Sequence, residues 1–293
     1  MKAKYKGILF IILSALCFAF MNMFVRLSGD LPSIQKSFFR NLIAFCIALA
    51  ALVRSGERFQ VKEGNWKYMI LRSAFGTIGI LCNFYAVDHL VMSDASMLNK
   101  MSPFFVILFS FLILKEKLTP IQVTAVCGAF AGSLLIIKPT FLNMNFLPSL
   151  IGLCGGLCAG IAYTMVRVLG QRGQKGTSVV LFFSGFSCLV TLPYLIFAYT
   201  PMSALQVLFL LGAGLAAAGG QFTITAAYYH APAREISVYD YSQIIFSALI
   251  GYVVFLQVPD RWSVLGYVII IAMAVWMFFY NQRHDAVSAS AKK

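Results

Sequence analysis

Apolar runs of about 20 residues, the length that a helix needs to cross a bilayer, recur from one end of this chain to the other. They are separated by short connections. The 293 residues are 60% hydrophobic and 11% charged, whereas roughly 25% of the residues of soluble domains are charged. A soluble globule is not expected from such a chain, because its surface could not be covered with polar groups. We expect an all-α integral membrane protein instead.

The pattern predicts ten transmembrane helices. Their expected limits are residues 7–28, 33–53, 68–88, 93–114, 120–137, 148–169, 177–199, 203–229, 234–256 and 261–280. The first run follows the basic segment MKAKYKG, which is also typical of a signal peptide. That run is of spanning length and no A-x-A cleavage pattern follows it, so we expect a membrane helix there.

Basic residues lie mainly on one side of the predicted membrane. Of 23 Lys and Arg residues, fifteen fall in connections on one side, only Lys138 and Arg261 fall on the other, and six lie inside spans. The positive-inside rule then predicts cytoplasmic termini in a cell (inner) membrane. The net charge of +13 is explained by these connections, so no nucleic-acid partner is expected.

The two halves of the chain are predicted to be repeats of opposite orientation. A shift of 141 residues places Asp94 on Glu235, and with it His89 on His230 and Ser96 on Ser237. Five spans in each half are an odd number, so such repeats must be inverted in the membrane. We expect one five-helix repeat at residues 1–140, a second at 141–281 and a cytoplasmic tail at 282–293.

Two segments inside predicted spans are too polar to face lipid, namely residues 94–103 and 235–243. At the same shift Asn99 falls on Asp240, and inverted repeats bring such residues together near the midplane, where transporters bind solute. Asp240 is expected to bind a substrate ammonium or a coupling proton, or to be a buried partner of Arg72 or Arg167. Pro103 frees a backbone carbonyl four residues earlier and predicts a kink at this level.

Depth along the spans places Arg26, Lys36, Arg40 and Lys100 toward the outer half, and Arg72, Arg167 and Asp240 toward the inner half. Arg40 either clamps a substrate carboxylate or is structural. Arg26 is expected to donate to helix-end carbonyls or to pair with Asp94, and a meeting of Arg26 with Arg40 in one outer vestibule is a further alternative. Lys36, Arg167, Asp94 and Glu235 are expected to be anchors or snorkelling groups rather than ligands.

The predicted substrate site combines these charges with amide and aromatic side chains at a similar depth. Its residues are Asn22, Arg40, Asn99, Tyr163, Gln221, Tyr239, Asp240 and Gln243. Asn22 and Asn83 are explained equally well by a hydrogen bond between helices. Most other aromatic residues are expected to serve in packing or in the interfacial belt.

Small residues at four-residue spacing, such as Gly152, Gly156 and Gly160, predict close helix packing within the chain. A homodimer face on span five or ten is the alternative. No phosphate-binding loop, nucleophile with a base, or metal-ligand spacing is found, and the seven cysteines lie within apolar runs. Neither an enzyme nor a cofactor or metal site is expected.

One stretch is similar to a known family: FYAVDHLVMSDASMLNKMSPFFVILFSFLILKEKLTPIQVTAVCGAFAGSLLIIKP. Its Tyr-Ala pair, its proline in span four and its Lys115-Glu116-Lys117 turn resemble the EamA-type branch of the drug/metabolite transporter superfamily. In the second half Ile244 replaces Pro103 and Gln257 replaces Glu116.

This resemblance implies ten helices in two inverted five-helix repeats. It also implies a central cavity lined by spans one, three, four, six, eight and nine, and movement of small metabolites. The segments Phe39-Arg40, Leu71-Arg72-Ser73 and Leu16–Asn22 are similar to the subgroup of S-adenosylmethionine uptake carriers.

The sequence therefore predicts a secondary-active transporter of a small polar metabolite, an amino acid-like or S-adenosylmethionine-like zwitterion, working by alternating access. Its expected partners are a small-molecule substrate, the lipid bilayer, a coupling proton or exchanged solute, and a candidate second copy of the chain. Alternatives are a broad-specificity metabolite or drug exporter, a channel, and a non-transporting membrane scaffold or sensor.

Overall fold

The computed structural model describes residues 3–56, 58–114, 119–138, 145–230 and 237–290, and this part of the chain is helical, with no β-strand. The elements are α1 (Ala3–Leu27), α2 (Ser33–Arg54), α3 (Trp66–His89), α4 (Met92–Asn99), α5 (Ser102–Leu114), α6 (Pro120–Ile137), α7 (Phe146–Gln171), α8 (Gly176–Ala198), α9 (Ala204–His230), η1 (Ser237–Tyr241), α11 (Ser242–Phe255) and α12 (Arg261–Ser290).

These elements form the ten predicted spans when α4 with α5, and η1 with α11, are each counted as one. Seven helices (α1, α2, α3, α7, α8, α9 and α12) are each long and apolar enough to cross a bilayer, and α6 adds a shorter apolar helix. Most predicted limits lie within a few residues of the observed ones. The last helix is longer than expected, because α12 continues through the predicted tail to Ser290.

The fourth and ninth spans are both broken, at corresponding positions. α4 ends at Asn99 and α5 begins at Ser102, whereas η1 ends at Tyr241 and α11 begins at Ser242. Pro103 lies in the first turn of α5, where its missing N–H leaves no helical hydrogen bond unmade. The second break has no proline and is formed by a 3₁₀ turn instead. The kink predicted from Pro103 is confirmed.

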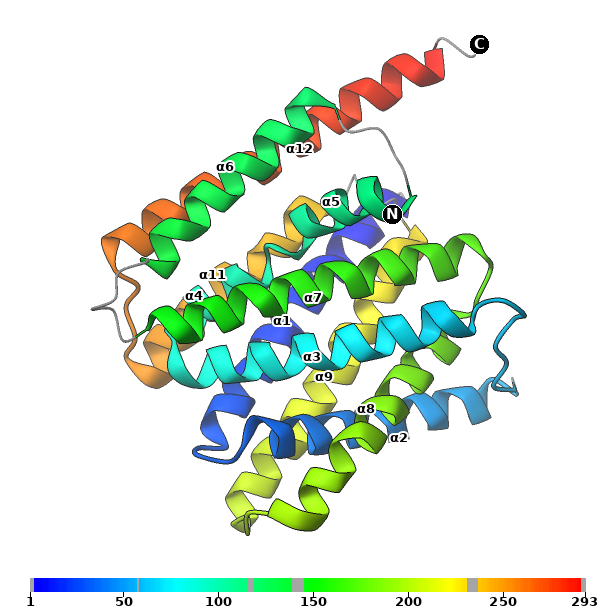
Figure 1. Cartoon of the computed structure of the whole chain (residues 1–293), viewed down its shortest axis with the longest axis vertical. Helices are drawn as coiled ribbons and strands as arrows, with labels where there is room; N and C mark the ends of the chain where they lie inside the picture. Colours follow the sequence, from blue (N-terminus) through cyan, green and yellow to red (C-terminus); the bar gives the residue numbers. More distant parts are fainter. Residues whose placement is uncertain (1–2, 57, 115–118, 139–144, 231–236, 291–293) are drawn as a thin grey trace.

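The helices pack in a pattern that stays the same when the two halves are exchanged. α1 packs along α9 as α7 packs along α3, and α1 contacts η1 and α11 as α7 contacts α4 and α5. α2 packs on α8 and α6 on α12, so each of these two pairs joins equivalent helices (Figure 1). Two inverted five-helix repeats produce this pattern.

Two glutamines repeat the same relation at opposite ends of the α2–α8 pair. Gln35, in the first turn of α2, donates to the carbonyl of Thr200 after α8 (2.8 Å) and accepts from its N–H (3.0 Å). Gln174, just before α8, donates to the carbonyl of Gln60 after α2 (2.7 Å) and accepts from the N–H of Lys62 (3.0 Å). Each glutamine thereby satisfies backbone groups of the connection beside it.

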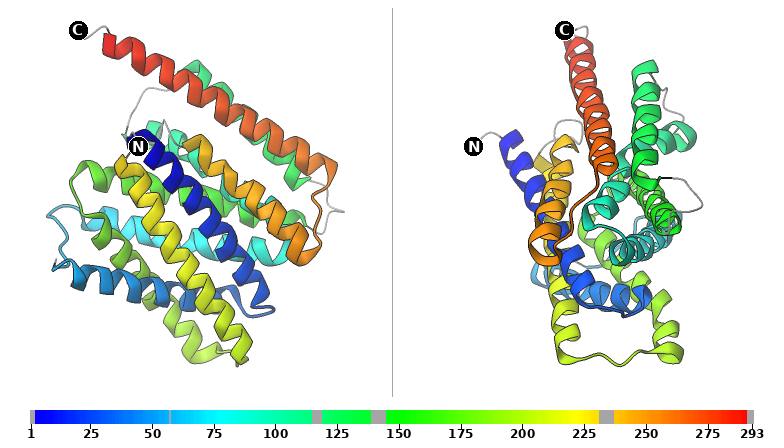
Figure 2. Two further views of the ribbon diagram at one scale, coloured as in Figure 1. Left: turned by 180° about the vertical axis from the view of Figure 1, so that it is seen from behind. Right: turned by 90° about the vertical axis from the view of Figure 1, so that its left-hand side faces the viewer.

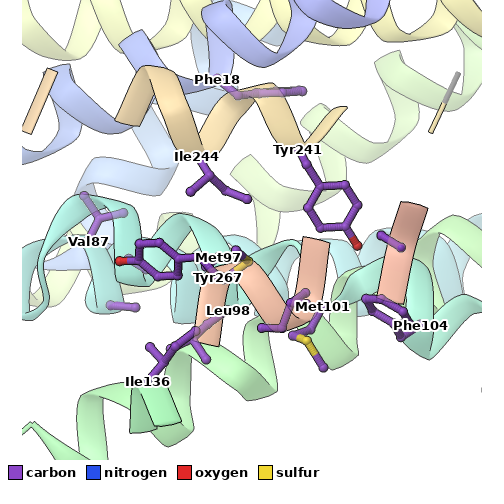
Figure 3. Close-up of a cluster of buried hydrophobic side chains, with 14 of the residues drawn as sticks. Phe18, Val87, Met97, Leu98, Met101, Phe104, Ile136, Tyr241, Ile244 and Tyr267 are labelled. Atoms are coloured by element: carbon purple, nitrogen blue, oxygen red, sulfur yellow. The ribbon is translucent and has the colours of Figure 1, made fainter. Parts of the chain in front are cut away.

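The broken helices lie inside the main apolar core. Met97, Leu98 and Met101 from the first break face Ile244 and Tyr241 from the second (Figure 3). Phe18 of α1, Ile136 of α6 and Tyr267 of α12 close the same cluster. The ends of the short helices are thus held by apolar packing, away from lipid.

α12 is also linked to α4 by hydrogen bonds. The hydroxyl of Tyr267 donates to the carboxylate of Asp94 (2.5 Å) and lies 3.0 Å from the hydroxyl oxygen of Ser93. Asp94 is only 8% exposed. Asp94 is therefore an anchor within the bundle, which is one of its expected roles, and the alternatives of snorkelling and of pairing with Arg26 were wrong. Glu235, its counterpart, lies outside the described residues.

α6 and α12 lie side by side at one edge of the bundle (Figure 2). Asp260 caps α12 by accepting from the backbone N–H groups of Trp262 (2.9 Å) and Ser263 (3.2 Å), and it pairs with Lys138 at the end of α6. Although its partial burial raises the pKa of Asp260, these hydrogen bonds together lower it to about 2. The cap therefore stays ionised at physiological pH.

Glycines allow α7 to touch the broken span directly. A Cβ added at Gly156 would lie 2.5 Å from the carbonyl oxygen of Leu98, and one added at Gly160 would lie 2.5 Å from the Cβ of Phe105. Gly132 of α6 is similarly close to α12, with the carbonyl oxygen of Gly266 at 3.1 Å from its added Cβ. The predicted use of these glycines for packing within the chain is confirmed.

We predict that Gly156→Ala destabilises the protein by about 1–3 kcal/mol, because the added methyl group meets backbone that cannot move aside. Thermal unfolding of the detergent-purified protein measures this effect as a lower Tm. Gly170→Ala is the matched control in the same helix, since nothing lies within 4 Å of a Cβ there. Equal Tm values for the two variants would contradict this account of the contact.

Candidate functional site

A cavity lies at the level of the two helix breaks. Six of the eight predicted site residues line it: Asn22, Arg40, Asn99, Tyr163, Gln221 and Gln243. They come from α1, α2, the first break, α7, α9 and α11, so both halves contribute. Spans two and seven also reach the cavity, through Arg40 and Phe183, in addition to the six spans implied by the family resemblance.

Three of these side chains make no hydrogen bond within the described part of the chain. They are the amide of Asn99, the hydroxyl of Tyr163 and the amide of Gln243, one from each of three elements around the cavity. Tyr163 is 37% exposed although it lies in the middle of α7. A buried polar group normally finds a partner in protein or water, so these groups are available to a polar solute.

Asn22 is held by its neighbours more firmly. Its side-chain oxygen accepts from the amide of Asn83 (3.2 Å), and its amide donates to the hydroxyl of Ser96 (3.5 Å). Ser96 in turn lies 2.7 Å from the hydroxyl oxygen of Ser247. This chain of hydrogen bonds joins α1, α3, α4 and α11 along the cavity wall. The interhelical role left open for Asn22 and Asn83 is therefore present in the structure.

An ion pair connects the two breaks. Nζ of Lys100 lies 2.5 Å from Oδ2 of Asp240, and the hydroxyl of Tyr241 donates to the carbonyl of Lys100 (3.2 Å). That hydroxyl supplies a partner for a carbonyl at the broken helix. The other oxygen of Asp240, Oδ1, is buried and makes no hydrogen bond within the described residues.

Lys100 was not among the expected partners of Asp240, which were Arg72 or Arg167. The side chain of Arg167 is not described. Arg72 instead lies over the ring of Phe183, with Cζ 4.0 Å from the ring centroid. Lys100 lines the cavity, whereas Asp240 and Tyr239 do not, and Tyr239 packs edge-on against Phe278 of α12.

Two arginines enter the cavity together. Arg40 is 2% exposed and Arg72 is 5% exposed. Nη1 of Arg40 donates to the side-chain oxygen of Asn41 (2.5 Å), whereas Nε of both arginines has no partner among the described residues. Gly76, one turn after Arg72, has no side chain and so leaves room for its guanidinium. Arg72 was absent from the predicted site, although the Leu71-Arg72-Ser73 match had singled it out.

Two other charged residues of the spans, Lys36 and Arg26, are bound within the protein. Lys36 is fully buried and binds both oxygens of Asp88 (2.7 and 2.8 Å), so the prediction that it snorkels was wrong. Arg26 donates to the carbonyls of Val87 (3.0 Å) and Leu90 (2.6 Å). This is the binding of helix-end carbonyls that was one of its expected roles. Arg26 does not line the cavity with Arg40.

Known transporters are similar to this chain in sequence. The model of the EamA-like transporter family matches residues 5–138. The chain is 29% identical to the pseudopaline exporter CntI of Pseudomonas aeruginosa, over 92% of this chain and 94% of that protein. It is 26% identical to solute carrier family 35 member G1 of Homo sapiens, over 92% of this chain and 78% of that protein.

A riboflavin transporter of Brucella anthropi is 27% identical over 83% of this chain and 88% of its own length. One solved crystal structure of a protein superposes with a TM-score of 0.66 at 17% identity, covering 94% of this chain and 98% of its own. That structural similarity concerns the fold alone.

We predict that the Lys100–Asp240 pair is energetically coupled. Lys100→Met or Asp240→Asn alone should each cost about 3–5 kcal/mol, because each leaves one buried group without its partner. The double variant should cost clearly less than the sum, by about 1–3 kcal/mol. Thermal or denaturant unfolding in detergent measures the four free energies of unfolding.

The surface pair Lys138–Asp260 gives the control cycle, with side chains that are 34% and 45% exposed. Its coupling should be below about 1 kcal/mol. Additive effects at Lys100 and Asp240 would contradict an ion pair that holds the two breaks together.

Proposed function

We propose that this chain is a secondary-active transporter of a small polar metabolite, of the EamA-like transporter family whose model matches residues 5–138. The observation that carries the proposal is the cavity at the two helix breaks, which both repeats line with polar groups, and several of their donors have no hydrogen-bond partner among the described residues. Solute sites of inverted-repeat transporters lie where broken helices of the two repeats meet.

Alternating access follows from this arrangement. The cavity lies between helices of opposite repeats, so rocking one repeat against the other opens it first to one side of the membrane and then to the other. The short helices α4 and α5 can move relative to each other at the break because residues 100 and 101 are not part of either helix. Asn99 and Lys100 at this position would follow such a movement directly.

The proposed substrate is a zwitterion of amino acid-like or S-adenosylmethionine-like chemistry. Arg40 would hold its carboxylate, while Asn22, Asn99, Tyr163, Gln221 and Gln243 would orient its other polar groups. Asp240, through its unpaired Oδ1, would receive the substrate ammonium or a coupling proton when the bond to Lys100 opens. Exchange of one solute for another is the alternative form of coupling.

We place this multi-pass protein in the cell (inner) membrane with cytoplasmic termini, on the strength of the asymmetry of its basic connections. The second candidate is a broad-specificity metabolite or drug exporter. It is favoured because one relative, whose alignment covers 92% of this chain, is an exporter by name. A scaffold or sensor would have no use for the unpaired polar groups of the cavity. The glycine contacts of α6 and α12 join these helices within one chain, so a homodimer across them needs its own test.

The proposal predicts selective stabilisation of the purified protein by its substrate class. A ligand at ten times its Kd raises the free energy of unfolding by about 1.4 kcal/mol. Thermal unfolding would be followed with amino acids, S-adenosylmethionine, nucleosides and polyamines. The stabilising compound should then enter proteoliposomes saturably and without ion conductance.

Asn99→Ala should reduce this uptake at least about tenfold, the effect of about 1.4 kcal/mol of lost binding, and leave Tm unchanged because the Asn99 side chain has no hydrogen-bond partner among the described residues. Asn145→Ala, at the exposed start of α7, is the control with normal uptake expected. Linear, unsaturable flux would indicate a channel. Full uptake by Asn99→Ala would remove this residue from the site.

A further inference from the structure

We propose that the cavity selects an organic anion, with Arg40 and Arg72 together holding an oxyanion group such as a carboxylate or a phosphate. This inference rests on the proposed function and narrows its substrate class. It adds Arg72 as a second specificity residue and excludes cationic solutes.

The two arginine side chains are buried at the same cavity. Arg40 of α2 and Arg72 of α3 line the same cavity and are 2% and 5% exposed. Among the described side chains, neither guanidinium forms an ion pair with a carboxylate. The two guanidiniums therefore face each other's charge without an acid between them.

The acidic side chains that the structure describes are bound to other groups or exposed. Three that lie within the helix bundle are engaged elsewhere: Asp88 by Lys36, Asp94 by Tyr267 and Asp240 by Lys100. Asp260 pairs with Lys138 at the surface, and Asp30 and Glu63 are exposed in connections. Among the acidic side chains that the structure describes, none remains to neutralise the two arginines.

The cavity keeps an excess of positive charge. Lys100 is neutralised by Asp240, so Arg40 and Arg72 leave an excess of two positive charges. A cation such as a polyamine, or a solute with a net positive charge such as S-adenosylmethionine, would add to this repulsion. An anion would remove it.

The N–H donors of the two guanidiniums are suited to an oxyanion group. Nε of both arginines is buried and makes no hydrogen bond, and Arg72 also has no side-chain hydrogen bond among the described residues. A guanidinium carries its N–H donors in a planar fork that matches two oxygens of one carboxylate or phosphate. The rings of Phe18 and Phe183, with Ile80, provide an apolar wall for the organic part of the solute.

The test compares ligands of different charge on the detergent-purified full chain by thermal unfolding and by isothermal titration calorimetry. The probes are succinate, L-glutamate and glycerol 3-phosphate as organic anions, L-glutamine as an uncharged-side-chain analogue of glutamate, and putrescine as a cation. Sodium sulfate and sodium chloride at matched ionic strength represent inorganic anions. At least one organic anion should bind ten times or more tightly than L-glutamine, and putrescine should not bind.

Arg40→Gln and Arg72→Gln should each weaken binding of that anion at least tenfold, and the corresponding Lys variants should recover part of it. Arg54→Gln, exposed at the end of α2, is the matched control with unchanged affinity. If a Gln variant does not fold, the order of the ligands on the unaltered protein decides. Succinate and glycerol 3-phosphate distinguish a carboxylate from a phosphate, and preference for either supports the inference.

Tighter binding of glutamine or putrescine than of every organic anion would overturn the inference. Stabilisation by sulfate or chloride alone would also overturn it, because the arginines would then hold an inorganic counter-ion. Saturable transport of a neutral or cationic metabolite would refute the anion site and leave the transporter proposal standing. Absence of saturable transport for every compound class would instead refute the proposed function.

Discussion

The structure depends on one constraint: lipid offers no hydrogen-bond partner, so every charge and every freed backbone group in a span must be satisfied by the chain itself or by a solute. Lys36 meets this constraint with Asp88, Arg26 with the carbonyls at the end of α3, and Asp94 with Tyr267. Insertion of one central charge costs at least about 2.5–3.5 kcal/mol, so these pairings are needed for the bundle to be stable. Arg40 and Arg72 are the two charged residues to which the described part of the chain supplies no carboxylate partner.

The same constraint explains why the cavity lies at the helix breaks. A broken helix exposes carbonyl and N–H groups, which are tolerated at membrane depth only inside protein or beside a wet cavity. Here the hydroxyl of Tyr241 binds the carbonyl of Lys100, and the side chains of Lys100 and Asp240 join one break to the other. We therefore propose that the breaks provide both the polar groups of the site and the point at which the repeats move.

Much of the fold could be predicted from the sequence, since apolar runs of spanning length have only one use in a chain of this composition. The level of the cavity was also predictable, because Pro103 and the polar segment around Asn99 had an acidic counterpart at Asp240. The partners of the charged residues could not be predicted. Depth counted from span ends assigned Arg40 and Arg72 to opposite halves of the membrane, as it did Lys100 and Asp240, yet each pair comes together. Helix crossing and the breaks bring such residues to one level, and neither can be deduced from position along a span.

The central claim is that one cavity at the helix breaks is open to each side of the membrane in turn. It is tested most directly by labelling Asn99→Cys, in a cysteine-free background, with a membrane-impermeant maleimide in right-side-out and in inside-out vesicles. The account predicts labelling from both sides, protection by a bound solute, and no ion conductance through the vesicle membrane. Labelling from one side only, or from neither, would contradict alternating access at this cavity.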